Sequence, residues 1–160
     1  METKGVIEVC TPREDIIKGV VSDEVYAAHL GQVRDGRAPS VYSDPNTYFR
    51  NTYPTDGLKT TIREVFSRLS GSEKSGSPLI KLETSLGGGK THTLIALYHL
   101  AKQGSRCPGA ERFIGDMRFD PVNVSVTIGT EMGVKQTESG PRTLWGHIAK
   151  NLFGDNGYQK

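Results

Sequence analysis

Residues 84–91 have the sequence Thr84-Ser85-Leu86-Gly87-Gly88-Gly89-Lys90-Thr91 and carry most of the information about the fold. Three successive glycines precede a Lys-Thr pair, which matches the second half of the phosphate-binding pattern G-x-x-x-x-G-K-[ST]. Glycines allow backbone N–H groups to turn toward phosphate oxygens without a Cβ in the way. Thr84 stands where the pattern has its opening glycine, so the loop departs from the pattern at its start.

The side chains of this loop suit a polyphosphate ligand. The Lys90 ammonium would contact the terminal phosphates, and the Thr91 hydroxyl would offer an oxygen to Mg²⁺. The start of the following helix would add unpaired N–H groups and a partial positive charge. We therefore predict that ATP and Mg²⁺ are bound by Ser85, Leu86, Gly87, Gly88, Gly89, Lys90, Thr91 and His92. The alternatives are a glycine-rich loop with an exposed lysine and, for His92, a polar side chain that contacts no ligand.

The segments around the loop predict alternating strands and helices. Residues 78–83 are a short apolar run typical of a strand, and residues 91–103 predict a helix that is apolar over a wide arc and packed between layers. Residues 122–128 alternate as a β-branched strand, and Pro141 would open a last helix with Trp145 in the core. This order predicts an α/β fold, the opening βαβα half of the parallel sheet of a P-loop NTPase, with a right-handed crossover.

The region before the loop predicts helices only. Helix starts are indicated at Thr11-Pro12, Ser22-Asp23, Asp44-Pro45 and Thr55, and the first of these helices would end near Gly19. The helix after Thr55 carries one apolar stripe, formed by Leu58, Ile62, Val65, Phe66 and Leu69. The sequence thus predicts a helical N-terminal section, residues 1–76, and the N-terminal part of a P-loop NTPase domain, residues 77–160.

Composition excludes several classes of protein. The chain has 160 residues, 35% of them hydrophobic, and a formal net charge of +2. A disordered tail would be less apolar, and a nucleic-acid-binding surface would need a larger positive charge. No apolar run approaches the roughly 20 residues of a membrane span, and the N-terminus lacks a signal peptide. Cys10 and Cys107 form no metal-binding pattern, so we expect a cytoplasmic protein without a disulfide framework.

Residues 86–100 resemble a family of large prokaryotic AAA-type P-loop ATPases, known mainly as a domain of unknown function and often encoded in anti-phage defence islands. Residues 44–49, 52–69 and 143–146 are similar to the same family. The resemblance implies a much longer parent protein that hydrolyses ATP to remodel a target. It also implies a homo-oligomeric parent and partners among DNA or DNA-modification proteins.

ATP turnover needs residues that the sequence does not clearly supply. No run of four apolar residues ends in the paired acids that hold Mg²⁺ in such ATPases, so we expect an incomplete domain that binds ATP and hydrolyses it negligibly. Glu131, at the end of the second predicted strand, is a candidate to activate the attacking water, with a solvated glutamate as the alternative. Two other functions remain open: a non-hydrolysing nucleotide-binding or interaction module, and a P-loop small-molecule kinase.

Other candidate residues have competing structural roles. One of Tyr48, Phe49 and Tyr53 would stack on the nucleotide base, although packing of the helical section is favoured. Histidines at 29, 99 and 147 are expected to be core or surface residues and not metal ligands. Cys107 lies beside Pro108 in the turn-rich stretch 104–109, and we expect it to be exposed.

Overall fold

Helices and short 3-10 turns form all the regular structure that the described part of the chain contains. The computed structural model describes residues 5–12, 14–19, 27–72, 77–84, 87–132, 141 and 143–154. The helices are α1 (Val6–Val9), α2 (Glu14–Ile17), α3 (Leu30–Arg34), α4 (Ser40–Ser43), α5 (Pro45–Asn51), α6 (Asp56–Leu69), α7 (Lys90–Gln103), α8 (Glu111–Ile114) and α9 (Leu144–Phe153). The 3-10 turns are η2 (Gly104–Arg106) and η3 (Gly129–Met132).

Two of the predicted helix starts are confirmed in atomic detail. The Asp44 carboxylate accepts a hydrogen bond from the Thr47 N–H at 2.8 Å, and Pro45 occupies the first position of α5. The Thr55 hydroxyl accepts from the Leu58 N–H at 3.3 Å at the start of α6. Each cap satisfies an N–H that the helix itself leaves unpaired, which fixes where the helix begins.

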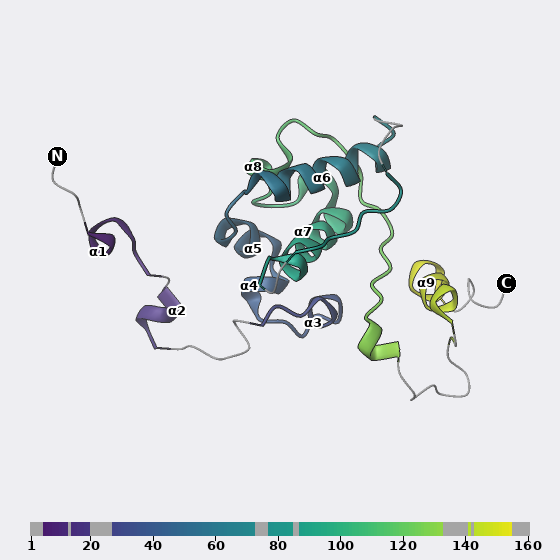
Figure 1. Ribbon diagram of the computed structural model, residues 1–160, viewed down its shortest axis with the longest axis horizontal. Coiled ribbons are helices and arrows are strands. Elements are labelled where there is room, and N and C mark those ends of the chain that lie inside the picture. Colours follow the sequence, from purple (N-terminus) through teal and green to yellow (C-terminus); the bar gives the residue numbers. More distant parts are fainter. Residues whose placement is uncertain are drawn as a thin grey trace.

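The N-terminal prediction is confirmed only in part. α2 lies within the helix predicted after Thr11-Pro12, and Gly19 follows it with a left-handed φ of 66°. Ser22 and Asp23, the predicted start of the next helix, lie outside the described residues. Figure 1 shows α1 and α2 away from the helices that form the core.

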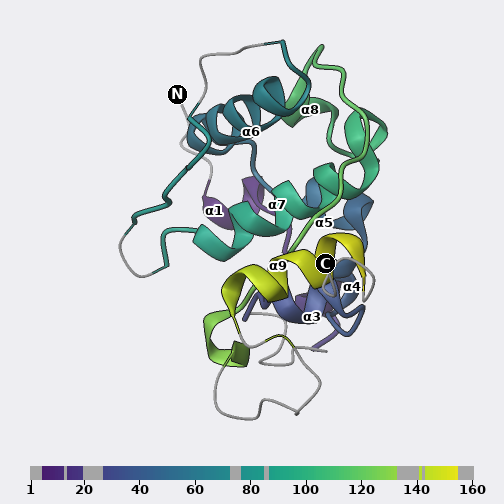
Figure 2. The ribbon, with the colours of Figure 1, turned by 90° about the vertical axis from the view of Figure 1, so that its right-hand side faces the viewer.

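The core is built around α7. This helix lies between α6 on one side and α3 on the other (Figures 1 and 2). Its buried side chains meet those of α5, α6 and α8 in one cluster, whose fully covered members include Phe49, Ile62, Phe66, Ile95 and Leu100. The predicted helix over 91–103 and its place between layers are therefore confirmed. The stripe on α6 is confirmed at three positions, whereas Leu69 is 54% exposed.

The predicted α/β fold is wrong. Residues 78–83 and 122–128 form neither a helix nor a β-strand, and the described residues contain no sheet. A strand exists only where its backbone pairs with a neighbouring strand. Leu79, in the first of these segments, is 80% exposed, which shows how little of this run is covered. The βαβα half of a P-loop NTPase sheet is therefore not what these residues form.

The segment over residues 122–128 packs against helices. Val122 and Val124 are partly buried against the core and Val126 is buried, so the predicted alternation does produce one covered face. The Val122 N–H donates to the last turn of α7, at the Ala101 carbonyl, 2.7 Å away. In a sheet, the backbone carbonyls of this segment would accept from a neighbouring strand, but here side chains donate to one of them. Arg34 of α3 and Asn151 of α9 both donate to the Val126 carbonyl at 3.3 Å.

The last helix begins later than predicted, and its aromatic residue is not in the core. α9 starts at Leu144, where the Thr143 hydroxyl accepts from the Gly146 N–H at 3.0 Å, and not at Pro141. Trp145 is 77% exposed, so its predicted burial is wrong. No residue of α9 is fully buried in the described structure.

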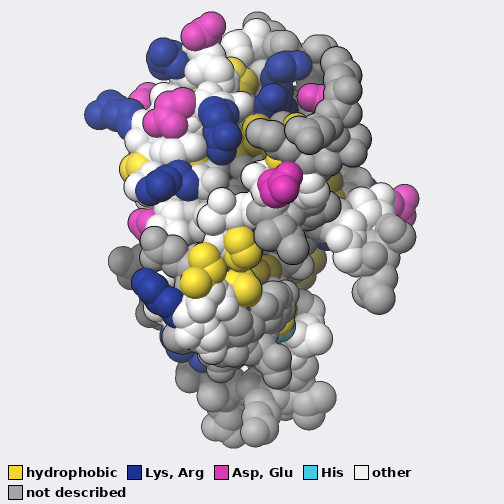
Figure 3. Space-filling model, turned by 90° about the vertical axis from the view of Figure 1, so that its left-hand side faces the viewer, with side chains coloured by type: hydrophobic (Ala, Val, Ile, Leu, Met, Phe, Trp, Pro, Cys, Tyr) yellow, Lys and Arg dark blue, Asp and Glu magenta, His cyan; other side chains and the backbone are white. Residues whose placement is uncertain are grey.

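The surface carries both signs of charge. On the face shown in Figure 3, Lys and Arg side chains alternate with Asp and Glu around a small hydrophobic group. This mixture agrees with the net charge of +2. Within the part of the chain that the structure describes, no helix combines the length and apolarity needed to cross a bilayer.

Candidate functional site

The glycine loop leads directly into the first turn of α7. Gly87 and Gly89 have left-handed φ angles of 78° and 76°, which side chains with a Cβ rarely adopt, and this explains the glycines at these two positions. Gly89 is the N-cap residue of α7, and its carbonyl accepts from the Thr93 N–H at 2.8 Å. The first N–H groups of a helix have no partner inside it, so this end of α7 favours an anion. Ser85 and Leu86 lie outside the described residues.

Lys90 bends back toward the start of the loop. Its ammonium donates to the Thr84 carbonyl oxygen and to the Thr84 hydroxyl oxygen, each at 3.0 Å. Both residues are exposed. The departure from the phosphate-binding pattern at Thr84 therefore supplies the lysine with a side-chain acceptor in addition to a backbone acceptor.

A hollow of about 530 Å³, the glycine-loop hollow, lies between the loop and the α5–α6 connection. Its rim includes the loop glycines and several hydroxyl and amide side chains. It is lined by Asn51, Thr52, Tyr53, Thr55, Gly57, Leu58, Thr61, Leu82, Thr84, Gly87, Gly88, Gly89, His92 and Thr93. The hollow is large enough for part of a small organic ligand and lies directly beside the loop N–H groups.

Residues of α5 hold the first turn of α7 in place. The buried Thr52 hydroxyl donates to the Tyr48 carbonyl at 2.7 Å and lies 2.8 Å from His92 Nε2. In the tautomer protonated at Nε2, His92 donates to the Thr52 hydroxyl oxygen, whose own proton goes to the Tyr48 carbonyl. The Tyr48 hydroxyl donates to the His92 carbonyl at 2.5 Å, and the two rings lie 4.7 Å apart between centroids. Three contacts thus fix His92 beside the glycine-loop hollow.

Burial sets the charge of this cluster. It lowers the pKa of His92, which keeps the imidazole neutral at neutral pH. It raises the pKa of Tyr48, so the hydroxyl remains a donor. The cluster is therefore uncharged, and its three hydrogen bonds tie the end of α5 to the first turn of α7.

The structure divides the predicted site residues between two hollows. Thr91 lines a second hollow of about 560 Å³ on another side of α7, together with residues of α3 and of the chain around Gly129. Thr91 is thus separated from the hollow that the loop glycines line. Glu131 lies in the 3-10 turn η3, whose first two residues, Gly129 and Thr130, line this second hollow.

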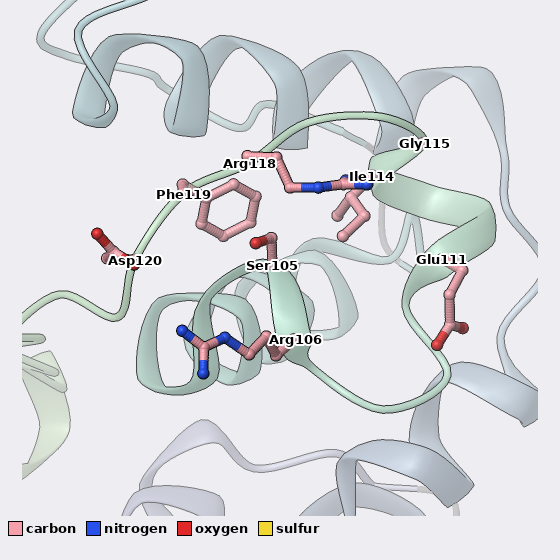
Figure 4. Close-up of a pocket in the computed structure, with 8 residues that line it drawn as sticks. All are labelled: Ser105, Arg106, Glu111, Ile114, Gly115, Arg118, Phe119 and Asp120. Carbon is pink, nitrogen blue, oxygen red and sulfur yellow. The ribbon is translucent and has the colours of Figure 1, made fainter.

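A third hollow, of about 630 Å³, lies near α8 and η2 and is unrelated to the loop. It is lined by Ser105, Arg106, Glu111, Ile114, Gly115, Arg118, Phe119 and Asp120. It sits at the opposite end of α7, which is about 20 Å long for its 14 residues. Figure 4 shows that its four charged side chains do not converge on one point. Two of these side chains are basic and two are acidic, so this hollow presents no group of like charges to a ligand.

Several further predictions can now be assigned. Tyr48 and Phe49 are buried, at 1% and 0% exposure, so packing is confirmed for both. Tyr53 is 81% exposed and lines the glycine-loop hollow, so it alone of the three aromatic residues is placed where a ligand can reach it. His99 is a core residue as predicted, with Nε2 2.8 Å from the Tyr42 carbonyl.

The expected exposure of Cys107 is wrong. The side chain is 2% exposed, and burial raises the pKa of its thiol to about 12.

Among the described residues, no three His, Cys, Asp or Glu side chains are close enough to hold a metal ion.

Sequence reasoning missed the contribution of α5 to the site. Asn51 and Thr52 face the loop, but they precede it by more than thirty residues, and no local pattern marks either of them. The nearest signal was the run of aromatic residues beside them, which includes Tyr53.

Comparison with known proteins identifies a family. A family model described as the DUF499 N-terminal domain matches residues 7–126, three quarters of the chain, and the chain therefore belongs to this family. No curated protein and no solved structure matches the chain.

Proposed function

We propose that this DUF499 N-terminal domain binds the phosphates of a nucleotide, ATP or ADP, at the glycine loop and the first turn of α7. One observation carries the proposal: two left-handed glycines lead into a 14-residue helix whose first side chain is Lys90. Backbone N–H groups and an ammonium are thereby gathered within a few residues. Such a group of donors suits the oxygens of a polyphosphate.

The glycine-loop hollow would take the nucleoside. Tyr53 offers an exposed aromatic face for stacking on a base, and Asn51 and His92 offer hydrogen-bonding groups beside it. The hollow adjoins Gly87 and Gly89, so a nucleoside there would direct its phosphates toward the loop. Lys90 would then leave Thr84 to reach them.

Magnesium would accompany the phosphates. Thr91 would supply one hydroxyl oxygen from the first turn of α7, on the side that faces the second hollow, and Mg²⁺ commonly takes its remaining ligands from phosphate oxygens and water. The described side chains that line the two hollows beside the loop include no carboxylate. Binding, and not turnover, is therefore what these described residues support, which favours a non-hydrolysing nucleotide-binding module as the second candidate function.

Hydrolysis is proposed for the longer parent protein. There, ATP bound at this loop would drive remodelling of a target, with DNA-associated proteins and defence against phage suggested by the resemblance described above. Glu131 is the proposed water-activating residue, and its place in η3 puts it near the segment that lines the hollow containing Thr91.

The test is calorimetric titration of the chain with Mg-ATP. Replacing Lys90 by Ala removes the ammonium, and we expect affinity to fall about tenfold to a hundredfold because a charge-assisted phosphate contact contributes about 1.5 to 3 kcal/mol. The matched control is Lys102→Ala, which removes an exposed lysine from the other end of the same helix.

The control variant should bind Mg-ATP as the unaltered protein does. Equal affinities for the unaltered protein and for Lys90→Ala would show that the loop is not the site. Helical content by circular dichroism must be the same in all three proteins, so that a loss of binding is not a loss of folding.

A further inference from the structure

Thr84 stands where the phosphate-binding pattern has a glycine, and the structure gives this residue a role. Its hydroxyl and carbonyl oxygens both lie 3.0 Å from Lys90 Nζ. A glycine at this position would keep the carbonyl and lose the hydroxyl. The side chain of Thr84 thus adds a second acceptor for the same ammonium that the proposed function assigns to phosphate.

We propose that the Thr84 hydroxyl competes with the ligand for Lys90 and thereby sets the affinity of the site. This inference rests on the proposed function. In the free protein, the ammonium is held at the start of the loop, and a phosphate must take it from Thr84. Thr84 is therefore an affinity-determining residue that weakens binding, although it lines the same hollow as the loop glycines.

The competition is possible because both groups are exposed. Water can replace either acceptor, so moving the ammonium does not leave a buried charge unpaired. A phosphate is ionised, whereas a hydroxyl and a carbonyl are neutral, so the phosphate is the stronger hydrogen-bond acceptor for an ammonium. The Thr84 contact consequently reduces affinity without preventing binding.

Two substitutions separate the effect of the Thr84 hydroxyl on affinity from the effect of the side-chain shape. Thr84→Val keeps the branched shape and removes the hydroxyl, whereas Thr84→Ser keeps the hydroxyl. We expect Thr84→Val to bind Mg-ATP about threefold to tenfold more tightly than the unaltered protein, which corresponds to one modest hydrogen bond. Thr84→Ser should bind as the unaltered protein does. The control is Thr60→Val, the same change at an exposed position of α6 outside the hollow.

A second measurement needs no nucleotide. Mass spectrometry of the ligand-free protein after brief treatment with an amine-acylating reagent gives the rate of modification of Lys90. This rate should rise in Thr84→Val and stay unchanged in Thr84→Ser and Thr60→Val, because only the first variant removes the hydroxyl acceptor of the ammonium and leaves it the backbone carbonyl.

The outcomes separate the two proposals. Failure of the unaltered protein to bind Mg-ATP would overturn the proposed function, and the acylation rates would still decide whether Thr84 holds Lys90. If the protein binds Mg-ATP and Thr84→Val matches it in affinity, the competition is overturned. Equal acylation rates in Thr84→Val and the unaltered protein would overturn the contact itself.

Discussion

At the scale of single residues, two histidines of α7 link stability to pH. His99 is 4% exposed and His92 is half-buried, and each has Nε2 within 2.8 Å of an oxygen, on Tyr42 and Thr52 respectively. Burial lowers the pKa of both side chains below the ordinary value of 6.5, and for His99 the Tyr42 carbonyl and the Asp44 carboxylate oppose part of this effect. The folded protein therefore takes up these protons only at a lower pH than the unfolded chain.

The free energy of unfolding should be highest above pH 6.5 and should decrease as the pH falls below that value. The decrease is at most about 1.4 kcal/mol per pH unit for each histidine and ends once the folded groups are also protonated. Urea denaturation at about pH 7.5, 6.5 and 5.5 measures it. His99→Gln should make the decrease smaller, because it removes one of the two imidazoles whose pKa burial lowers. Stability that rises on acidification over this range would contradict the assignment.

At the scale of secondary-structure elements, the helices with local signals were predictable. A capping carboxylate at Asp44, a capping hydroxyl at Thr55 and a repeating apolar stripe gave the starts of α5 and α6, because these interactions involve residues within one turn. The exposure of Trp145 was not predictable, since an amphipathic pattern says which face is apolar and not whether anything covers it.

The end of α7 supplies a prediction at this scale. Gly104 has a φ of 66°, and a Cβ there would lie 2.7 Å from the Phe119 carbonyl oxygen and 2.9 Å from the Pro121 ring. Gly104→Ala should therefore lower the free energy of unfolding by about 3 kcal/mol or more, through backbone strain together with a clash. Gly115 is the matched control, because its φ of 57° is similar but a Cβ would meet open space.

Gly115→Ala should cost only the backbone strain, about 1 to 3 kcal/mol. Chemical denaturation of both variants gives the difference. Equal losses of stability would mean that the close approach between the end of α7 and the segment at Phe119 does not exist in solution.

At the scale of the whole molecule, the sequence predicted a sheet that the described residues do not form. The alternation of Val122, Val124 and Val126 correctly indicated one buried face, but a strand also needs a partner for its backbone. Whether a segment has such a partner depends on residues that are distant in the sequence. Here the side chains of Arg34 and Asn151 donate to the Val126 carbonyl, and no neighbouring strand does so among the described residues. Local periodicity therefore predicted burial and could not predict pairing.

The candidate site was predictable to a similar extent. The glycines, Lys90 and the following helix are contiguous in sequence, so their proximity follows from the chain itself. The contribution of Thr52, and the separation of Thr91 from the glycine-loop hollow, depend on how α3 and α5 pack against α7. Those contacts join residues that lie tens of positions apart.

The central claim is that nucleotide phosphates bind at the glycine loop, and one measurement locates the ligand directly. Backbone amide resonances of the isotopically labelled protein are followed by NMR during titration with Mg-ATP. The account predicts that the largest shifts occur at Gly87, Gly88, Gly89 and the first turn of α7. Shifts confined to Arg106 and Arg118 in the hollow near α8, or no shifts at all, would contradict it.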